Sequence, residues 1–334
     1  MGYDLAVRQE VLVTGAAGFL GSNLCRVLLE AGHAVRGVDN LSQSTTLNVE
    51  PLLGAPGFRF AREDVRDEHA MGKAAAGVSV IVHLAAFKIP RYGNALDTLL
   101  VNTHGTESML KAAAGARARL VFASTSDVYG KNPRLPFAET DDLHLGETAV
   151  KRWAYATSKI FDEHLCFAYQ QERGVPVTIL RFFGSYGPGQ NRTWWGGPQS
   201  VFIDAALRGR EMDVHGDGQQ TRSFTYVDDT VDGIVRALWS ERAAGEIFNI
   251  GNTKPVTIQA LAEMVWRLAG TGEPKIRRVS YQAFGRYEDV RARVPEIGKA
   301  REVLGFEPRV GLEEGLRRTI EWQRAVMAGE GSLP

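Results

Sequence analysis

The chain has 334 residues, and its 39 acidic side chains balance its 39 basic ones, so the formal net charge is zero. This balance provides no overall basic field of the kind that attracts nucleic acid. Hydrophobic residues make up 44% of the chain and charged residues 23%, as in a globular enzyme, and no apolar run is long enough to cross a bilayer. The sequence therefore predicts neither a nucleic-acid partner nor a membrane partner.

The segment from Met1 to Glu10 lacks the basic and then apolar pattern of a secretory signal. The two cysteines, Cys25 and Cys166, each lie among apolar neighbours, which favours buried thiols in a reducing cytoplasm over a disulfide. No group of histidines and cysteines has the spacing of metal ligands. We therefore expect a cytoplasmic protein without a metal centre.

A glycine triplet near the N-terminus separates an expected strand from an expected helix. The apolar run Val11 to Thr14 predicts a buried parallel strand, and Gly15-x-x-Gly18-x-x-Gly21 follows it directly. Gly15 permits a tight turn, Gly18 a close approach of the backbone to a diphosphate, and Gly21 close packing of the helix on the strand. The amides of the first helical turn would bind the diphosphate. The predicted dinucleotide contacts in this segment are Gly15, Ala17, Gly18, Phe19, Leu20 and Gly21.

A second expected strand, Ala34 to Val38, ends in Asp39. A carboxylate at this place can accept hydrogen bonds from both hydroxyls of the adenosine ribose and would repel a 2′-phosphate. Asp39, with its neighbour Asn40, therefore predicts NAD rather than NADP as the cofactor. A glycine-rich turn followed by a solvated aspartate is the alternative, and the agreement of strand, helix and acid argues against it.

Strands and helices alternate through the first half of the chain. We expect strands at 58–61, 78–84, 120–123 and 177–182, and helices at 96–114 and 153–171. This alternation predicts an α/β fold, in which residues 1–182 form a doubly wound parallel sheet of the Rossmann type.

The remaining residues, 183–334, are less regular. The segment 184–197, rich in glycine and tryptophan, predicts a functional loop. After it we expect helices at 198–208, from about 228, at 258–269 and at 312–327, and strands at 224–226 and 247–250. We interpret this half as a smaller substrate-binding lobe against the carboxyl ends of the sheet. It would not fold alone, and some of its segments would return to the first domain.

Tyr155 and Lys159 are four residues apart, which places them on one face of the expected helix at 153–171. A fixed ammonium, together with a positive nicotinamide, lowers the pKa of a tyrosine and makes it a usable base near neutrality. Thr125, at the tip of an expected strand, offers a hydroxyl that can share the substrate proton. An ordinary surface pair is the alternative reading of Tyr155 and Lys159, and the NAD motif upstream argues against it.

These motifs resemble the extended short-chain dehydrogenase/reductases that modify nucleotide sugars, and the resemblance spans nearly the whole chain. It rests on Asp39, Asn102 and the segments 14–21, 64–65, 83–86, 124–130, 155–159, 181–183, 186–188, 216–222, 226–229, 248–251 and 304–308. The cofactor contacts that the resemblance adds are Asp64, Val65, Leu84, Ala85, Ala86, Asn102 and Lys159. It also implies that Arg222 holds the diphosphate of the substrate and that the helices 96–114 and 153–171 form a homodimer.

The resemblance also implies a mechanism. Tyr155 removes the proton of the sugar 4-hydroxyl while a hydride passes from C4 to NAD, which leaves a 4-keto sugar. The hydride then returns to the other face in an epimerase. A C5 carboxylate leaves as carbon dioxide in a decarboxylase, and water is lost across C5 and C6 in a dehydratase.

The segment Thr125-Ser126-Asp127 bears on the choice among these reactions. The family's dehydratases carry Thr-Asp-Glu there, so Ser126 argues against dehydration, whereas UDP-glucuronate decarboxylases carry Thr-Ser-Glu. Arg293 is similar to an active-site arginine of a decarboxylase, and Arg192 to the carboxylate-binding arginine of uronate 4-epimerases. We therefore predict that Ser126 and Asp127 act beside Thr125. The predicted substrate contacts are Lys88, Arg192, Arg222 and Arg293.

Our preferred interpretation is an NAD-dependent 4-epimerase of a UDP-hexose or UDP-hexuronate, because the redox residues are intact and no complete elimination pair is present. A UDP-glucuronate decarboxylase is the main alternative, followed by a nucleotide-sugar dehydratase and a simple NAD(P)H reductase. A reductase of a small ketone would not need Arg222, and a non-catalytic NAD-binding regulator would not need both Tyr155 and Lys159.

Overall fold

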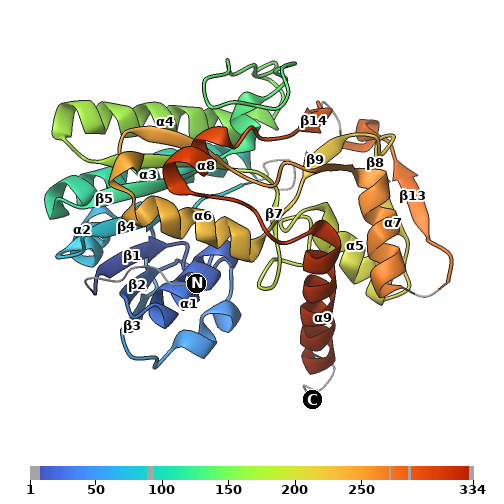
Figure 1. The fold of residues 1–334 in the computed structure, drawn as a ribbon, viewed down its shortest axis with the longest axis horizontal. Coiled ribbons are helices and arrows are strands. Elements are labelled where there is room, and N and C mark those ends of the chain that lie inside the picture. The colour runs from blue at the N-terminus through green and yellow to red at the C-terminus, as the bar shows by residue number, and fades with distance from the viewer. Residues whose placement is uncertain (1–7, 89–93, 271, 285–286, 331–334) are drawn as a thin grey trace.

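The computed structural model describes residues 8–88, 94–270, 272–284 and 287–330. Its centre is a parallel sheet of seven strands in the order β11-β6-β5-β4-β1-β2-β3 (Figure 1). The strands are β1 (Glu10–Thr14), β2 (Ala34–Val38), β3 (Phe58–Ala61), β4 (Val80–His83), β5 (Arg119–Thr125), β6 (Val177–Phe182) and β11 (Glu246–Ile250). This order is that of a doubly wound Rossmann-type fold, as the sequence predicts.

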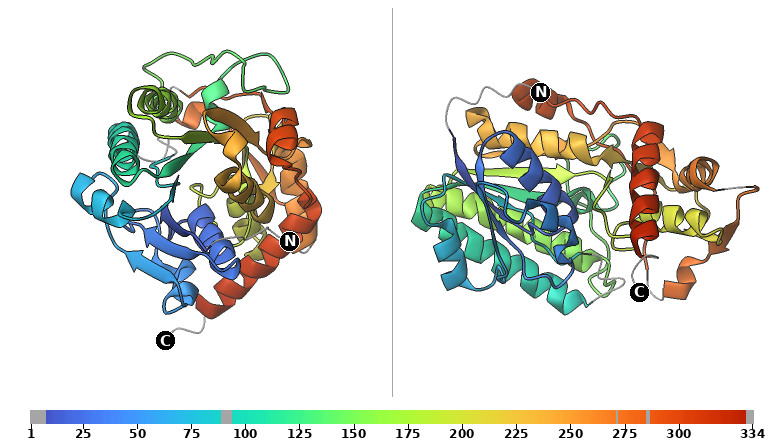
Figure 2. Two further views of the ribbon diagram at one scale, coloured as in Figure 1. Left: turned by 60° about the vertical axis from the view of Figure 1, so that its left-hand side comes forward. Right: turned by 90° about the horizontal axis from the view of Figure 1, so that it is seen from below.

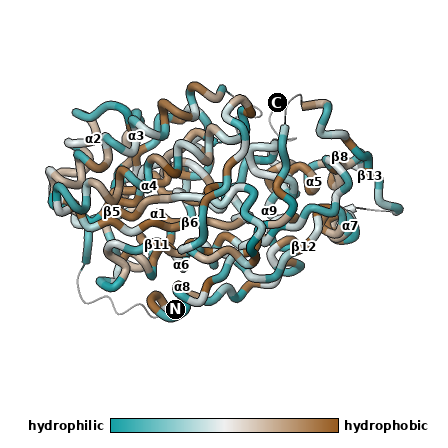
Figure 3. The backbone as a smooth tube through the Cα atoms, turned by 90° about the horizontal axis from the view of Figure 1, so that it is seen from above, coloured by the Kyte–Doolittle hydropathy of each residue, from teal (hydrophilic) through white to brown (hydrophobic). Residues whose placement is uncertain are grey.

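Helices cover both faces of the sheet because successive side chains of a strand point to opposite faces. The left view of Figure 2 shows the two layers, which are formed by α1 (Phe19–Glu30) and α6 (Val227–Trp239) on one side and by α2 (Glu68–Ala75), α3 (Ala95–Ala116) and α4 (Trp153–Arg173) on the other. In β1, Val11 and Val13 belong to the hydrophobic core under α1 and α6, whereas Leu12 belongs to the core under α2, α3 and α4. Hydrophobic residues accordingly gather along the strands and along α1 in the interior (Figure 3).

A smaller lobe lies beyond the carboxyl ends of the strands, at the right of Figure 1. Its elements are β7 (Ser185–Tyr186), α5 (Pro198–Leu207), β8 (Met212–His215), β9 (Thr221–Ser223), β10 (Thr225–Tyr226), β12 (Pro255–Thr257), α7 (Ile258–Ala269), β13 (Ile276–Val279), β14 (Ala292–Arg293) and α9 (Leu312–Glu330). β9 lies between β12 and β14, and in the β9–β14 pair Arg222 is directly opposite Arg293. This short sheet therefore brings two arginines that are distant in sequence to one place.

Part of the second half of the chain returns to the sheet. α6 packs on α1, β11 pairs with β6, and α8 (Gly298–Leu304) packs on β11. After residue 183 the chain therefore passes between the lobe and the sheet several times. None of the described helices is long and apolar enough to span a membrane.

Candidate active site

A cavity of about 1300 Å³ lies between the carboxyl ends of the sheet strands and the smaller lobe. The sheet contributes the loop after β1, the segment after β4 and the end of β5, while the lobe contributes Arg222, Tyr281 and Arg293. The carboxyl ends of a doubly wound sheet are where such folds bind their ligands. The cavity is therefore the candidate active site.

The glycine triplet forms the floor of the dinucleotide half of this cavity. Gly15 has φ of 69°, and a side chain on it would come within 2.9 Å of the amide nitrogen of Ala85. A side chain at Gly21 would collide with the carbonyl oxygen of Gly15, so the helix can approach the loop only with glycine there. Together with the amino end of α1, this side-chain-free cradle fits the diphosphate of NAD.

Asp39 is held in place at the end of β2. Its carboxylate accepts hydrogen bonds from the amides of Ala17 at 3.1 Å and Leu41 at 2.8 Å and from the hydroxyl of Ser44 at 3.0 Å. A negative charge fixed on the cavity wall in this way disfavours a 2′-phosphate. This geometry supports the predicted preference for NAD over NADP.

Most of the predicted cofactor residues line the cavity: Gly15, Gly18, Phe19, Leu20, Gly21, Asp39, Asn40, Val65, Leu84, Ala85, Ala86 and Lys159. Ala17, Asp64 and Asn102 do not line it. Asp64 is instead bonded to Arg66 and Asn40.

Asn102 holds the chain after β4 in place. Its side chain is bonded to both backbone groups of Phe87 and to the Ser158 hydroxyl, and it is 1% exposed. These bonds fix both side chains at the edge of the cavity, and the cofactor contacts of Asp64 and Asn102 stay predictions.

The hydroxyls that the sequence predicts to be catalytic meet where β5 ends beside α4. The Thr125 hydroxyl lies close enough to Tyr155 to act on its phenol, and Ser126 and Asp127 follow in a 3₁₀ turn that also faces the cavity. Burial raises the pKa of Tyr155, and the Asp127 carboxylate raises it further, while the nearby Thr125 hydroxyl opposes both. Without the cofactor, the pKa of Tyr155 is therefore raised, whereas the sequence predicts a lowered one. The lowering depends on the positive charge that oxidised nicotinamide brings.

Lys159 is 1% exposed, and its ammonium lies 4.4 Å from the centre of the Phe122 ring. Burial lowers the pKa of this lysine. The ammonium therefore sits in a dry part of the wall, one helical turn beyond Tyr155, as the four-residue spacing predicts.

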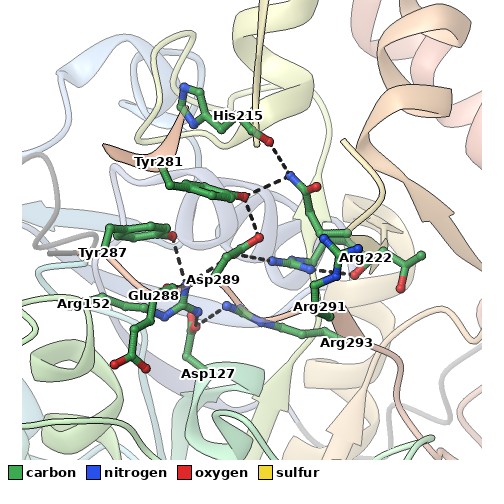
Figure 4. Close-up of polar contacts among 12 residues, drawn as sticks. Asp127, Arg152, His215, Arg222, Tyr281, Tyr287, Glu288, Asp289, Arg291 and Arg293 are labelled. Atoms are coloured by element: carbon green, nitrogen blue, oxygen red, sulfur yellow. Dashed lines mark hydrogen bonds and ion pairs between the residues drawn. The ribbon is translucent and has the colours of Figure 1, made fainter. Parts of the chain in front are cut away.

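A cluster of arginines and aspartates surrounds Asp127 (Figure 4). We define the arginine cluster as Arg152, Arg222 and Arg293 together with Asp127 and Asp289. Asp127 is 2.6 Å from Arg293 and 3.2 Å from Arg152, and Asp289 is 3.1 Å from Arg222 and 3.6 Å from Arg152. Three cations against two anions leave one net positive charge facing the cavity, which suits an anionic substrate.

The charges in the arginine cluster act on one another. Burial favours the neutral form of Asp127, but Arg293 and Arg152 outweigh it and hold the pKa of its carboxyl below the usual value. Burial and the nearby Arg293 lower the pKa of Arg222 to about 10, although Asp289 opposes them. Asp127 is therefore a carboxylate at neutral pH in the free protein, and Arg293 is already paired.

Aromatic residues support the cluster from the lobe. The Tyr281 hydroxyl donates to Asp289 at 2.6 Å, and Arg152 donates to the Tyr287 hydroxyl at 3.0 Å (Figure 4). Trp194 stacks on His215, with ring centres 4.3 Å apart, so it packs into the lobe while it lines the cavity. All four predicted substrate contacts, Lys88, Arg192, Arg222 and Arg293, also line the cavity.

Sequence reasoning missed Arg152, Tyr281, Tyr287 and Asp289. Arg152 precedes Tyr155 by three residues, so helical spacing could have indicated that both face the cavity. The other three lie in short irregular segments with no periodic pattern to find. Among the described residues, no group of three histidine, cysteine, aspartate or glutamate side chains could hold a metal ion.

Comparisons with known proteins agree with this geometry. The sequence profile of the NAD dependent epimerase/dehydratase family matches residues 11–251. The UDP-N-acetyl-alpha-D-glucosaminuronate decarboxylase of Bacillus cytotoxicus is 36% identical over 96% of this chain and 99% of its own length. UDP-glucuronic acid decarboxylase 1 of Xenopus tropicalis is 37% identical over 94% of this chain and 72% of its own length.

Solved structures give the same picture for the fold. The UDP-glucuronic acid 4-epimerase of Bacillus cereus, in complex with UDP-glucuronic acid and NAD, superposes with a TM-score of 0.86. It is 29% identical, and the match covers 95% of this chain and 99% of that one. The chain is thus similar both to decarboxylases and to a 4-epimerase of nucleotide sugars.

Proposed function

Because the chain belongs to the NAD dependent epimerase/dehydratase family, we propose that it acts on a UDP-hexuronate and releases the sugar carboxylate as carbon dioxide. Its cofactor is NAD, and its reaction passes through a 4-keto sugar nucleotide. The observation that carries the choice of reaction is the 2.6 Å ion pair between Asp127 and Arg293, beside Tyr155.

This ion pair favours loss of a carboxylate over its retention. Carbon C6 is two bonds from C4, so a hexuronate whose 4-hydroxyl reaches Tyr155 brings its carboxylate close to Asp127. The substrate carboxylate must then share Arg293 with a like charge, and incomplete neutralisation destabilises the ground state relative to neutral carbon dioxide. A uronate 4-epimerase needs the opposite, a tight two-pronged contact that holds the carboxylate while the 4-keto sugar turns.

The catalytic residues then have the following roles. The bound cofactor supplies a hydride acceptor, and later a hydride donor, for C4 of the sugar. Tyr155 takes the proton of the 4-hydroxyl, and Thr125 orients the phenol. In the 4-keto sugar the C5–C6 bond breaks, its electron pair enters the enolate of the ketone, and carbon dioxide leaves. A proton from solvent then adds to C5. When C4 is reduced again, Tyr155 returns its proton to the C4 oxygen, which becomes a hydroxyl.

The remaining cations suit the rest of the substrate. A UDP-hexuronate carries the charges of a diphosphate as well as a carboxylate, which is more than the single net charge of the arginine cluster can balance. We assign Arg222 to the diphosphate, because a guanidinium binds phosphate oxygens in pairs. Lys88 and Arg192 add positive charge along the same cavity.

Product analysis tests the proposal. The purified protein with NAD is incubated with UDP-glucuronate, UDP-N-acetylglucosaminuronate and UDP-glucose, and the products are separated and weighed by mass spectrometry. We expect a product that has lost carbon dioxide from at least one uronate, and none with Tyr155→Phe, which removes the base. A product of unchanged mass and new retention would instead identify a 4-epimerase, the reaction to which the Bacillus cereus neighbour points.

We also propose that the protein is a cytoplasmic homodimer. Leu96 and Leu100 of α3 and Phe161 of α4 expose large apolar side chains on adjacent helices, which supports a helical interface between two copies. Cys25 and Cys166 are buried and unpaired, as expected of thiols in a reducing compartment.

A further inference from the structure

The inner face of α4 carries a buried carboxylate that the mechanism above does not use. Asp162 is 0% exposed, and neither of its carboxylate oxygens has a hydrogen-bond partner among the described residues. Its neighbour Glu163, by contrast, is paired with Arg181 at 2.6 Å and accepts from the hydroxyl of Ser124. A buried carboxylate without hydrogen bonds is costly, so its presence requires a compensating interaction.

The groups around Asp162 identify that interaction. Lys159 precedes it by one helical turn on α4 and is the cation that acts on it, whereas the like charge of Glu163 opposes it. Thr106 on α3 faces Asp162, but the two make no hydrogen bond of ordinary geometry. The thiol of Cys166, one turn further along α4, is buried and neutral.

His83 on β4 is also close enough to Lys159 to feel its charge. Its Nδ1 lies 2.8 Å from the hydroxyl of Thr14, and burial lowers its pKa to about 3. It is therefore neutral and adds no like charge beside the ammonium. Two acidic residues, Asp162 and Glu163, lie one turn from Lys159 on α4. Glu163 is neutralised by Arg181, whereas Asp162 has no arginine partner among the described residues.

We propose that Asp162 is a positioning residue that acts through Lys159: its buried carboxylate, one helical turn away, is the counter-charge of the buried ammonium. The inference rests on the proposed function, in which Lys159 is the predicted cofactor contact beside the base Tyr155. Residues three apart lie on the same face of a helix, and a nearby opposite charge favours the charged form of a buried group. The ammonium would then stay protonated up to a higher pH than burial alone allows. In this form it can donate hydrogen bonds to the cofactor ribose.

The buried charge of Asp162 lowers the stability of the folded protein. Burial raises the pKa of Asp162 to about 6, although Lys159 opposes the shift. The folded state thus keeps a proton that the unfolded chain releases at lower pH, so stability falls as the pH rises from about 4 to about 6. A neutral residue of the same shape should therefore stabilise the fold above pH 6, whereas a residue needed only for packing should not.

The test compares Asp162→Asn with the wild type and with Thr106→Val, which removes the facing hydroxyl and leaves the charge. Three quantities are measured: the pH profile of kcat/KM, the dissociation constant for NAD at pH 7 and pH 9, and the melting temperature of the cofactor-free protein at pH 8. For Asp162→Asn we expect the alkaline limb of the profile to move down by about one pH unit. NAD should bind several-fold more weakly at pH 9 than at pH 7, and the melting temperature should rise.

Thr106→Val should keep the wild-type limb. An unchanged alkaline limb and unchanged NAD binding in Asp162→Asn would overturn the inference. Lys159→Met separates this failure from that of the proposed function. If Lys159→Met is inactive while Asp162→Asn keeps the wild-type profile, only the role of Asp162 is wrong; if Lys159→Met remains active, the catalytic role of Lys159 is wrong as well.

Discussion

At the scale of single residues, the proposed function depends on a few charges held at fixed places on the cavity wall. Asp39 is fixed by three hydrogen bonds, and Asp127 by two arginines. Because these side chains cannot turn away, they act on a ligand with full charge and without further loss of side-chain entropy. Two substitutions test this view.

Replacing Asp39 by alanine should weaken NAD binding about ten- to a hundredfold, the range expected when hydrogen bonds to a charged group are lost. NADP binding should change little or improve, because the charge that repels a 2′-phosphate is gone. Glu50→Ala, which removes an exposed carboxylate outside the cavity, is the matched control. Titration calorimetry with both cofactors measures the effect, and a wild type that binds NADP as well as NAD would contradict the assignment.

Replacing Arg293 by alanine should lower kcat/KM for UDP-glucuronate by about two orders of magnitude, because Asp127 loses its closest cation and the substrate carboxylate meets a less neutralised charge. Arg291→Ala is the control. That side chain lies two residues earlier, is 68% exposed and pairs with Asp217 at the surface. Steady-state kinetics with UDP-glucuronate and UDP-glucose decide the matter. Equal losses on both substrates would rule out a hexuronate as the preferred substrate.

At the scale of elements, the contact between β1 and α1 sets the depth of the cofactor cradle. Gly21→Ala would place a methyl group against the carbonyl oxygen of Gly15, so α1 must move outward. We expect a loss of about 1–3 kcal/mol in unfolding free energy, as in other overpacked sites, and a smaller rise of melting temperature on adding NAD.

Gly72→Ala in α2 provides the control for this substitution. Its added methyl group would meet nothing within 4 Å, so helix propensity alone should stabilise the protein by about 0.5–1 kcal/mol. Denaturant unfolding with and without NAD measures both variants. If Gly21→Ala behaved like Gly72→Ala, the close approach of helix and loop would not be needed for the cradle.

At the scale of the whole molecule, the exposed apolar residues of α3 and α4 concern assembly. Phe161→Glu would place a charge in the proposed interface and should convert a dimer into monomers, because an unpaired charge is costly to bury between subunits. Leu53→Glu, an equally drastic change of an exposed leucine between β2 and β3, should leave the dimer intact. Light scattering after size-exclusion chromatography measures the mass, and a monomeric wild type would contradict the proposal.

The sequence by itself determined the elements whose signals are local. The glycine triplet, Asp39 at the end of β2 and the four-residue spacing of Tyr155 and Lys159 each depend on one strand or one helix. A repeating apolar pattern predicts such elements before any long-range contact is known. The parallel sheet and its cofactor cradle could therefore be predicted from the chain alone.

Only the tertiary structure decided what surrounds the reacting groups. Arg152 directly precedes α4, Arg222 lies in a three-residue strand, and Arg293 lies in a two-residue strand paired with it. Strands this short have too few residues to show an alternating pattern, and their pairing is set by contacts between distant segments. The same holds for Asp127, whose pairing with Arg293 cannot be read from either segment. The net charge that faces the substrate is the sum of these pairings, so it exists only in the folded chain.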